Sequence, residues 1–403
     1  MLYKVKKKTL HYAKKLYSLL LGNPPSVDAG STFSWYMMLI AVPLGLFVGK
    51  LVVGFLSLIQ WASRFLFNLS DDQPPFDSGS AELIFVLMVP TLAGLIVGLI
   101  RWRLIAGSRI QGLGDVIYYV MKKNAKLPSK CGFWSSCASA LSLAGGASAG
   151  AESPVAHLGA WVTSYVSRFK NITPTERRTL VACAVAAAIA CAFNAPVGGA
   201  FFAMEIILGY FSPAIFAPII IASVAGAVVT RHFKGDISTF ILPEYQLVSL
   251  YELPGFILLG IVCALAAITL CRSIDLAQTA FHHLSTKIWI RPAIGGLLVG
   301  VVATQFPHIL GIGTYITESI LNHQLPLMIL FILAITKILA SAITIGSGFS
   351  SGTIGPALMI GAITGSFFGI IAGSVLPEFA SSHGAYAIVG MGAMVSSIVG
   401  GPI

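Results

Sequence analysis

The stretch GGASAGAESPVAHLGAW, residues 145–161, places a single carboxylate, Glu152, among glycine, alanine and serine residues. Its central part, GAESPVAHLGA (150–160), is similar to the segment GTIGPALMIGA (352–362), which lies 202 positions later. Both segments read G-x-x-x-P-x-x-x-x-G-A without a gap. This match predicts that the chain contains two structural copies of one unit, each with a helix that begins near the shared proline.

Two weaker matches support the repeat, because they occur in the same order along the chain. GSR at 107–109 corresponds to GIG at 311–313, and FNAP at 193–196 corresponds to VGGP at 399–402. Repeats of this kind in transporters are often inverted across the membrane, with the ion site where they meet. We therefore predict four parts, of which the last is expected to be incomplete at its C-terminal end: an amphipathic segment 1–27, a first repeat 28–232, a linker 233–251 and a second repeat 252–403.

The composition is that of a membrane protein. Hydrophobic residues make up 56% of the chain, charged residues make up 10%, and the mean hydropathy is +0.86. Soluble globular domains fall outside this range. Because the 41 glycines and 20 prolines interrupt other apolar segments, we expect an all-α polytopic fold with tilted and broken helices. Runs long enough to cross a bilayer lie at 34–60, 83–100, 253–271 and 326–345.

The formal net charge of +10 does not require a nucleic-acid partner, and we expect none. Basic residues cluster at expected helix ends and in short loops, as they do on the cytoplasmic side of membrane proteins. In segment 1–27, apolar residues occupy one helical face and lysines the rest, which predicts an interfacial helix on the cytoplasmic surface. We expect an integral protein of a bacterial inner (plasma) membrane with a cytoplasmic N-terminus.

Cysteine and histidine spacing gives no sign of a metal site or a cofactor. None of the six cysteines forms a C-x-x-C pair, and the eight histidines form no H-E-x-x-H pattern. The sequence GASAG at 146–150 does read G-x-S-x-G, so Ser148 with His157 as base gives a remote alternative, an intramembrane serine protease. We expect that the protein is not an enzyme.

The two repeat motifs predict a paired anion site. Proline is tolerated in the first helical turn, where the N–H groups have no partner within the helix. The free N–H groups and the helix dipole attract anions. Two opposed copies would aim two such helix starts, 151–155 and 353–357, at one point in the membrane. Ser108, which opens another apolar segment, is a third candidate for this point; the alternative is an ordinary N-cap serine.

Glu152 then has a physical role. A carboxylate near mid-membrane is costly unless something compensates it, and the helix start that attracts an anion would also attract this side chain. When ionised, it would occupy the anion site; when protonated, it would lose that attraction and swing away. This predicts a proton-sensitive gate. The alternative is a helix-start carboxylate that stabilises its own helix dipole and faces water.

These residues resemble the CLC family of chloride channels and proton/chloride exchangers over essentially the whole chain. The resemblance implies a homodimer with one anion pathway per subunit and an inverted repeat in each subunit. It also implies chloride or another small anion, together with protons, as the transported species. Lys337 fits the family pattern ahead of the last motif. The motifs that carry the resemblance are GSRIQ (107–111), GAESP (150–154), ERRTLVACAVAAAIACAFNAPVGGAFFAMEI (176–206) and GSGFSSGTIGPALMIGA (346–362).

Carried over by motif, the resemblance assigns a role to three places in the chain. Ser108 matches the anion-coordinating serine of the family's GSGIP, and Glu152 matches the gating glutamate of its G(K/R)EGP. Ile354 and its neighbours match GxFxP, whose backbone amides help to bind the anion. The full set of expected anion-binding residues is Gly107, Ser108, Arg109, Gly150, Ala151, Ser153, Thr353, Ile354 and Gly355.

Several positions depart from the family pattern. Arg109 and Gln111 replace Gly and Pro, Ala151 replaces Lys or Arg, Ser153 replaces Gly, and Ile354 replaces Phe. These changes lie in the motifs expected to bind the anion, so selectivity and rate are where we expect this chain to differ from its relatives. A fluoride-specialised relative is one alternative, although Ser108 favours an ordinary halide.

One departure bears on mechanism. Many exchangers of the family carry a proton-transfer glutamate directly after the position of Glu205, and here that position is Ile206. Isoleucine cannot relay a proton, so the expected function is channel-like or loosely coupled chloride transport gated by Glu152. The alternative is a proton-coupled chloride antiporter with a different internal proton route. A cation transporter is less favoured, because helix N-termini repel cations.

Overall fold

A computed structural model describes residues 35–68, 83–105, 107, 110–167, 172–236, 240, 252–284, 286–322, 326–375 and 381–401. The predicted interfacial helix 1–27 and most of the predicted linker 233–251 lie outside these residues. The bounds of the predicted repeats therefore stay a prediction.

The described part is almost entirely helical. The elements of its first half are α2 (Trp35–Leu66), α3 (Leu83–Arg103), α4 (Leu113–Lys122), α5 (Ser129–Ala144), α6 (Glu152–Val166), α7 (Pro174–Phe193), α8 (Pro196–Phe202), the π-helix η3 (Ala203–Leu208) and α9 (Pro213–Lys234). The second half holds α10 (Leu253–His283), α11 (Arg291–Ala303), the 3-10 turn η5 (Pro307–Ile309), α12 (Thr314–Leu321), α13 (Leu327–Ser347), α14 (Ile354–Val375) and α15 (His383–Val399).

Six of the described helices are long and apolar enough to cross a membrane: α2, α3, α9, α10, α13 and α14. Four of them coincide with the apolar runs predicted from sequence to within one residue at their starts, so these predictions are confirmed. Large apolar side chains cover the outside of α10, where Leu258, Leu265 and Leu276 are exposed. Exposed leucines on a helix of this length are what a lipid-facing surface requires.

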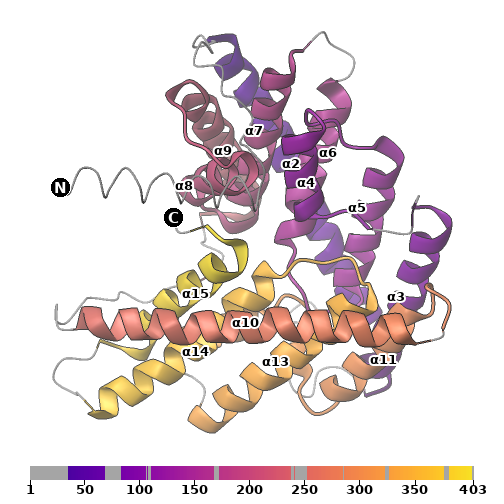
Figure 1. Cartoon of the computed structure of the whole chain (residues 1–403), viewed down its shortest axis with the longest axis vertical. Helices are drawn as coiled ribbons and strands as arrows, with labels where there is room; N and C mark the ends of the chain where they lie inside the picture. Colours follow the sequence, from indigo (N-terminus) through magenta and orange to yellow (C-terminus); the bar gives the residue numbers. More distant parts are fainter. Residues whose placement is uncertain are drawn as a thin grey trace, which may run out of the picture.

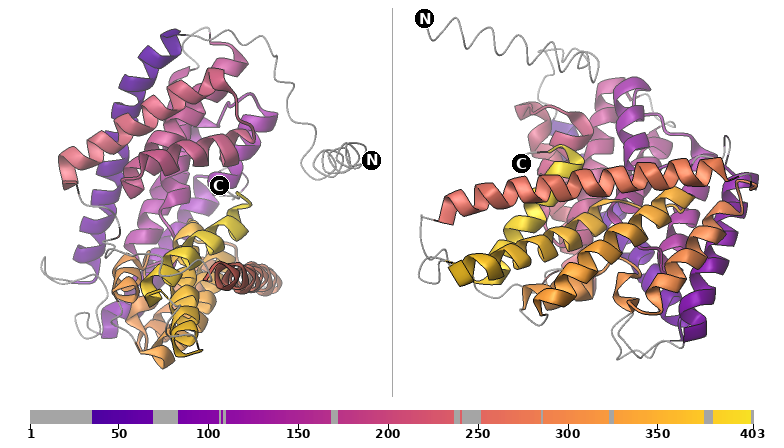
Figure 2. Two further views of the ribbon diagram at one scale, coloured as in Figure 1. Left: turned by 90° about the vertical axis from the view of Figure 1, so that its left-hand side faces the viewer. Right: turned by 60° about the horizontal axis from the view of Figure 1, so that its bottom comes forward.

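The two halves form two adjoining bodies of helices (Figures 1 and 2). Helices α2 and α4–α9 lie together in one body, and α10 runs across α13, α14 and α15 in the other. Helix α3 of the first half packs against α11 of the second. The core of the first half is α7, in which the small residues from Val181 to Ala190 are buried. Small side chains let neighbouring helix backbones approach closely, which is how membrane helices pack.

The sequence repeat appears as a structural repeat with an offset of 202 positions. Helices α6 and α14 begin at equivalent residues, Glu152 and Ile354. Just before them, Gly146 and Gly348 are also equivalent, and both have a left-handed backbone with φ of 81° and 102°. Equivalent residues that adopt the same uncommon conformation are strong evidence that the two copies share one backbone path.

Contacts between the copies obey an internal two-fold relation. Gly150 and its equivalent Gly352 pair with each other as an isolated antiparallel bridge. Two serine pairs, related by the same offset, cross between the halves. The Ser139 and Ser350 hydroxyl oxygens lie 2.5 Å apart, and those of Ser341 and Ser148 lie 3.4 Å apart. The predicted all-α inverted-repeat fold is confirmed.

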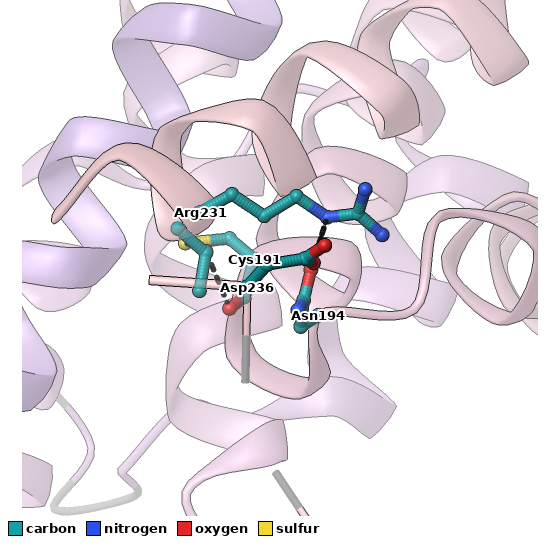
Figure 3. A network of polar contacts seen from close by, with 5 residues as sticks. Cys191, Asn194, Arg231 and Asp236 are labelled. Atoms are coloured by element: carbon teal, nitrogen blue, oxygen red, sulfur yellow. Dashed lines mark hydrogen bonds and ion pairs between the residues drawn. The ribbon is translucent and has the colours of Figure 1, made fainter. Parts of the chain in front are cut away.

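The third sequence match, FNAP with VGGP, marks the ends of two further equivalent helices. Asn194 directly follows α7 and Gly400 directly follows α15, and both of these C-cap residues are left-handed, with φ of 53° and 75°. Figure 3 shows how α9 is tied to the end of α7: the Arg231 Nε donates to Asn194 Oδ1 at 3.1 Å and lies 3.1 Å from Asp236 Oδ1. Because both charged side chains are largely exposed, this ion pair contributes at most about 1 kcal/mol.

Candidate anion site

The starts of α6 and α14 meet at the centre of the molecule. The Gly150 N–H donates to the Gly352 carbonyl at 2.9 Å, and the Gly352 N–H donates back to the Gly150 carbonyl at 3.0 Å. A Cβ atom on Gly355 would lie only 2.6 Å from the Gly150 Cα. Glycine at these positions is therefore what permits the close approach of the two backbones, and the predicted meeting of the two helix starts is present.

Glu152 is buried at this meeting point, with only 3% of its surface exposed. Its Oε2 accepts a hydrogen bond of 3.2 Å from the Gly355 N–H in the first turn of α14. The carboxylate of one copy thus occupies the N-terminal end of the other copy's helix, where free N–H groups and the helix dipole stabilise negative charge. Glu152 therefore does not face water, as the alternative expected.

A cavity of about 270 Å³ adjoins the two helix starts. Three of the residues expected to bind an anion line it: Ser153, Thr353 and Ile354. Ile206, the position without a proton-relay acid, is also in its wall. The remaining lining comes from α4, the segment before α14 and the end of α15: Leu113, Gly114, Ile117, Ser351, Gly352, Ile398 and Val399.

Ser351 is a polar group of this cavity that the sequence motifs did not single out. Its Oγ is buried and has no hydrogen-bond partner within the described residues. Buried hydroxyls usually have a partner, so this oxygen is available to a ligand in the cavity. Its position directly before the GTIGP motif was the signal in the sequence that could have identified it.

The other expected anion-binding residues lie in different surroundings. The Ser153 hydroxyl already accepts a 2.9 Å hydrogen bond from the Leu113 N–H, which ties α4 to α6. Ala151 packs in an apolar cluster, and Gly107 is exposed with a φ of 74°. Ser108 and Arg109 lie outside the described residues, so their expected roles stay predictions.

Lys337 of α13 is fully buried near the site. Its ammonium donates hydrogen bonds of 3.0 Å to the carbonyls of Ile309 and Gly311. Gly311 in turn donates to the Gly146 carbonyl of the first copy at 3.3 Å. These contacts connect the buried ammonium of Lys337 to the segment of the first copy that leads into α6.

Two side chains considered for other chemistry are held in structural contacts. Ser148 is fully buried and lies against Ser341, whereas a nucleophilic serine must be exposed on a sharp turn. The His157 Nε2 lies 3.4 Å from Gln111 Oε1. Neither contact supports the protease alternative. Within the described residues, no group of three or more His, Cys, Asp or Glu side chains could hold a metal ion.

The fold and the site together define a class: a polytopic membrane protein with an inverted repeat whose two copies place helix starts around a buried acid. The sequence profile of the family described as voltage gated chloride channel matches residues 92–403. The chain belongs to this family, which is the CLC family that its motifs resemble. The family consists of channels and transporters.

Individual relatives agree with this assignment. A ClcB-like protein from Ralstonia nicotianae is 30% identical over 79% of this chain and 75% of its own length. An H⁺/Cl⁻ exchange transporter, ClcA from Vibrio cholerae, is 31% identical over 63% of this chain and 56% of its own length. A slow cyanobacterial Cl⁻/H⁺ antiporter of known structure superposes with a TM-score of 0.79, covering 91% of this chain and 86% of that one, at 21% identity. At 21% identity, the similarity to the cyanobacterial antiporter shows a shared fold.

Proposed function

We propose that this protein exchanges chloride, or a similar small anion, for protons across a membrane, with Glu152 as the protonatable gate. The observation that carries the proposal is the position of Glu152. It is a buried carboxylate whose Oε2 accepts from the Gly355 N–H of the opposite helix start. A group in that position competes with any anion that uses the same N–H groups.

Protonation decides which of the two competitors is bound. In its ionised form, the Glu152 carboxylate is held by the N–H groups and dipole of α14 and excludes the anion. In its neutral form, it loses most of this attraction and leaves the helix start. An anion entering from the adjoining cavity then replaces it, so one proton taken up is linked to one change in anion occupancy.

Exchange is favoured over the channel-like transport predicted from Ile206. Two of the similar proteins are named as an H⁺/Cl⁻ exchange transporter and a Cl⁻/H⁺ antiporter. The substitution at Ile206 removes one acid, but Ile206 borders a cavity that also holds the unpartnered Ser351 hydroxyl. Water bound there would give protons a route to Glu152 that needs no second carboxylate. Channel-like transport remains the second candidate, and the missing acid is the observation that favours it.

The cellular setting belongs to the same proposal. A bacterial inner membrane, a cytoplasmic N-terminus and a homodimer with one pathway per subunit follow from the family and from the basic segment 1–27. This chain spans 56% of the Vibrio cholerae transporter, so the activity of the whole relative is carried over as a proposal as well.

Reconstituted vesicles separate the two candidates. Vesicles loaded with chloride are placed in low-chloride medium, with a potassium ionophore to carry the compensating charge, while external chloride and pH are recorded together. Exchange requires protons to enter as chloride leaves, so the medium becomes alkaline. Chloride efflux without an alkaline shift beyond that of protein-free vesicles would replace exchange by channel-like transport, and the absence of efflux would overturn the proposal altogether.

A further inference from the structure

A second cavity, of about 380 Å³, lies at the junction of α3, α10, α11 and α13 and shares no described lining residue with the cavity of the anion site. Its chemistry is strongly basic: Arg101, His282, His283 and Arg291 all line it. The rest of the wall is Gln278, Thr279, Phe281, Ile345, Gly346, Ser347 and Gly348. Neither aspartate nor glutamate is among the lining residues that belong to the described part of the chain.

The two arginines come from different halves of the chain and face the same space. Arg101 is in the last turn of α3 and Arg291 is the first residue of α11, and both line this cavity. Asp275 on α10 lies one turn before Thr279 but is exposed and outside the lining. Positive side chains that line one cavity, with no acid among its described lining residues, are stabilised when an anion binds between them.

Arg291 has hydrogen-bonding capacity left for such an anion. Its Nη2 makes long contacts of 3.4 Å and 3.5 Å with the carbonyls of His282 and Leu284. Its Nε is buried and has no hydrogen-bond partner in the described part of the chain.

The cavity also lies at a level where lipid headgroups are expected. The rings of Trp102 and Trp289 lie 6.4 Å apart beside the two arginines in sequence, and Arg103 stacks over the Trp102 ring at 4.6 Å. Tryptophan with arginine at the ends of membrane helices is typical of the boundary between hydrocarbon and headgroups. The cavity is also far larger than a single halide needs.

We propose that this basic cavity binds a phosphate group, carried by an anionic lipid headgroup or present as free phosphate. The planar guanidinium fork matches phosphate oxygens with two parallel hydrogen bonds, which a spherical halide cannot accept in the same way. A bound phosphate would join α3 of the first half to α11 of the second and so stabilise the junction. The proposal is independent of Glu152 and of the transport mechanism.

The test uses the purified chain in detergent and measures its melting temperature by the loss of monodisperse protein on heating. Three additions are compared at equal ionic strength: phosphatidylglycerol in mixed micelles, inorganic phosphate, and chloride. The variants are Arg101→Gln and Arg291→Gln. Arg103→Gln is the matched control, because Arg103 is a neighbouring exposed arginine that does not line the cavity.

Stabilisation by phosphatidylglycerol alone would identify the lipid headgroup as the source, and stabilisation by inorganic phosphate as well would identify the phosphate group itself. Each cavity variant should then bind the stabilising probe about tenfold more weakly, because a charged hydrogen-bonded contact is lost, whereas Arg103→Gln should bind it normally. An equal effect of chloride, no effect of either probe, or unchanged binding by both cavity variants would overturn the proposal.

If a cavity variant does not fold, the proposal can still be tested on the unaltered chain. Native mass spectrometry of that chain should detect phosphatidylglycerol retained in preference to phosphatidylcholine when both are present in equal amounts, or phosphate adducts if free phosphate is the ligand. Equal retention of the two lipids, without phosphate adducts, would count against the cavity as a phosphate site.

Discussion

At the scale of single residues, two buried ionisable side chains define the site. Glu152 is bound by an N–H group of the opposite copy, and Lys337 is bound by two carbonyls beside it. A lone acid in an apolar chain was enough to single out Glu152 from sequence. Its partner Gly355, 203 positions away, could be inferred only as one of several backbone groups, because the repeat fixes which helices meet but not which atoms do.

The first prediction concerns pH. If the ionised Glu152 carboxylate occupies the helix start, lowering the pH raises the neutral fraction and frees the site. Chloride efflux from vesicles should therefore rise as the pH falls, and the Glu152→Gln variant should show a flat profile. Efflux assays across a pH series check this. A wild-type profile that falls toward acid pH would contradict the gate.

The second prediction concerns Lys337. Replacing it with methionine keeps much of the side-chain volume but leaves the Ile309 and Gly311 carbonyls without their ammonium donor. We expect a loss of about 2 kcal/mol or more in stability, seen as a lower melting temperature of the purified protein. Lys122→Met, at an exposed lysine on α4, is the control. Equal melting temperatures for the two variants would show that the buried ammonium is not structural.

At the scale of elements, glycine and proline patterns predicted where the helices of the site begin. Pro154 and Pro356 are both the third residue of their helices, as the repeat suggested. The ends of spanning helices were less predictable: the apolar runs 34–60 and 253–271 continue as helix to Leu66 and His283. Backbone hydrogen bonds extend a helix past the point where apolar side chains stop, so hydropathy alone underestimates its length.

The third prediction tests the close approach of the two helix starts. A methyl group on Gly355 would lie 2.6 Å from the Gly150 Cα, so Gly355→Ala should push α14 away from α6. We expect a loss of about 1–3 kcal/mol in stability and reduced anion efflux. Gly392→Ala on α15 is the matched control, since a Cβ there meets nothing within 4 Å. That variant should be neutral or stabilised by the better helix propensity of alanine.

The Gly355→Ala variant could have the melting temperature and the anion efflux of the unaltered chain. That result would contradict the close contact between the two helix starts. Melting temperature and efflux should be measured on the same preparations, because lower efflux at normal stability would still place the effect at the anion site.

At the scale of the whole molecule, the internal two-fold relation joins the halves. The offset of 202 positions was visible in the sequence from the GAESP and GTIGP segments. It also relates Ser139 to Ser341 and Ser148 to Ser350, but serine is too common for such pairs to be recognised without coordinates. The basic cavity was equally hidden, because Arg101 and Arg291 are 190 positions apart and belong to no shared motif.

The fourth prediction uses the unequal lengths of the two related serine contacts. The Ser139–Ser350 distance is 2.5 Å, whereas the Ser148–Ser341 distance is 3.4 Å. Ser139→Ala should cost about 1 kcal/mol, as the loss of a buried hydrogen bond does, and Ser341→Ala should cost clearly less. Melting temperatures of the two variants, prepared side by side, check the difference. A reversed order would contradict it.

The most direct test of Glu152 as the group that links protons to the anion is simultaneous chloride and proton recording on vesicles that contain the Glu152→Gln variant. Its side chain cannot ionise, so we expect that chloride efflux persists while the alkaline shift of the medium disappears. Asp275→Asn, at an exposed acid on α10, should retain both signals. An alkaline shift that persists in Glu152→Gln at the wild-type ratio to chloride would contradict the assignment of Glu152 as the group that links protons to the anion.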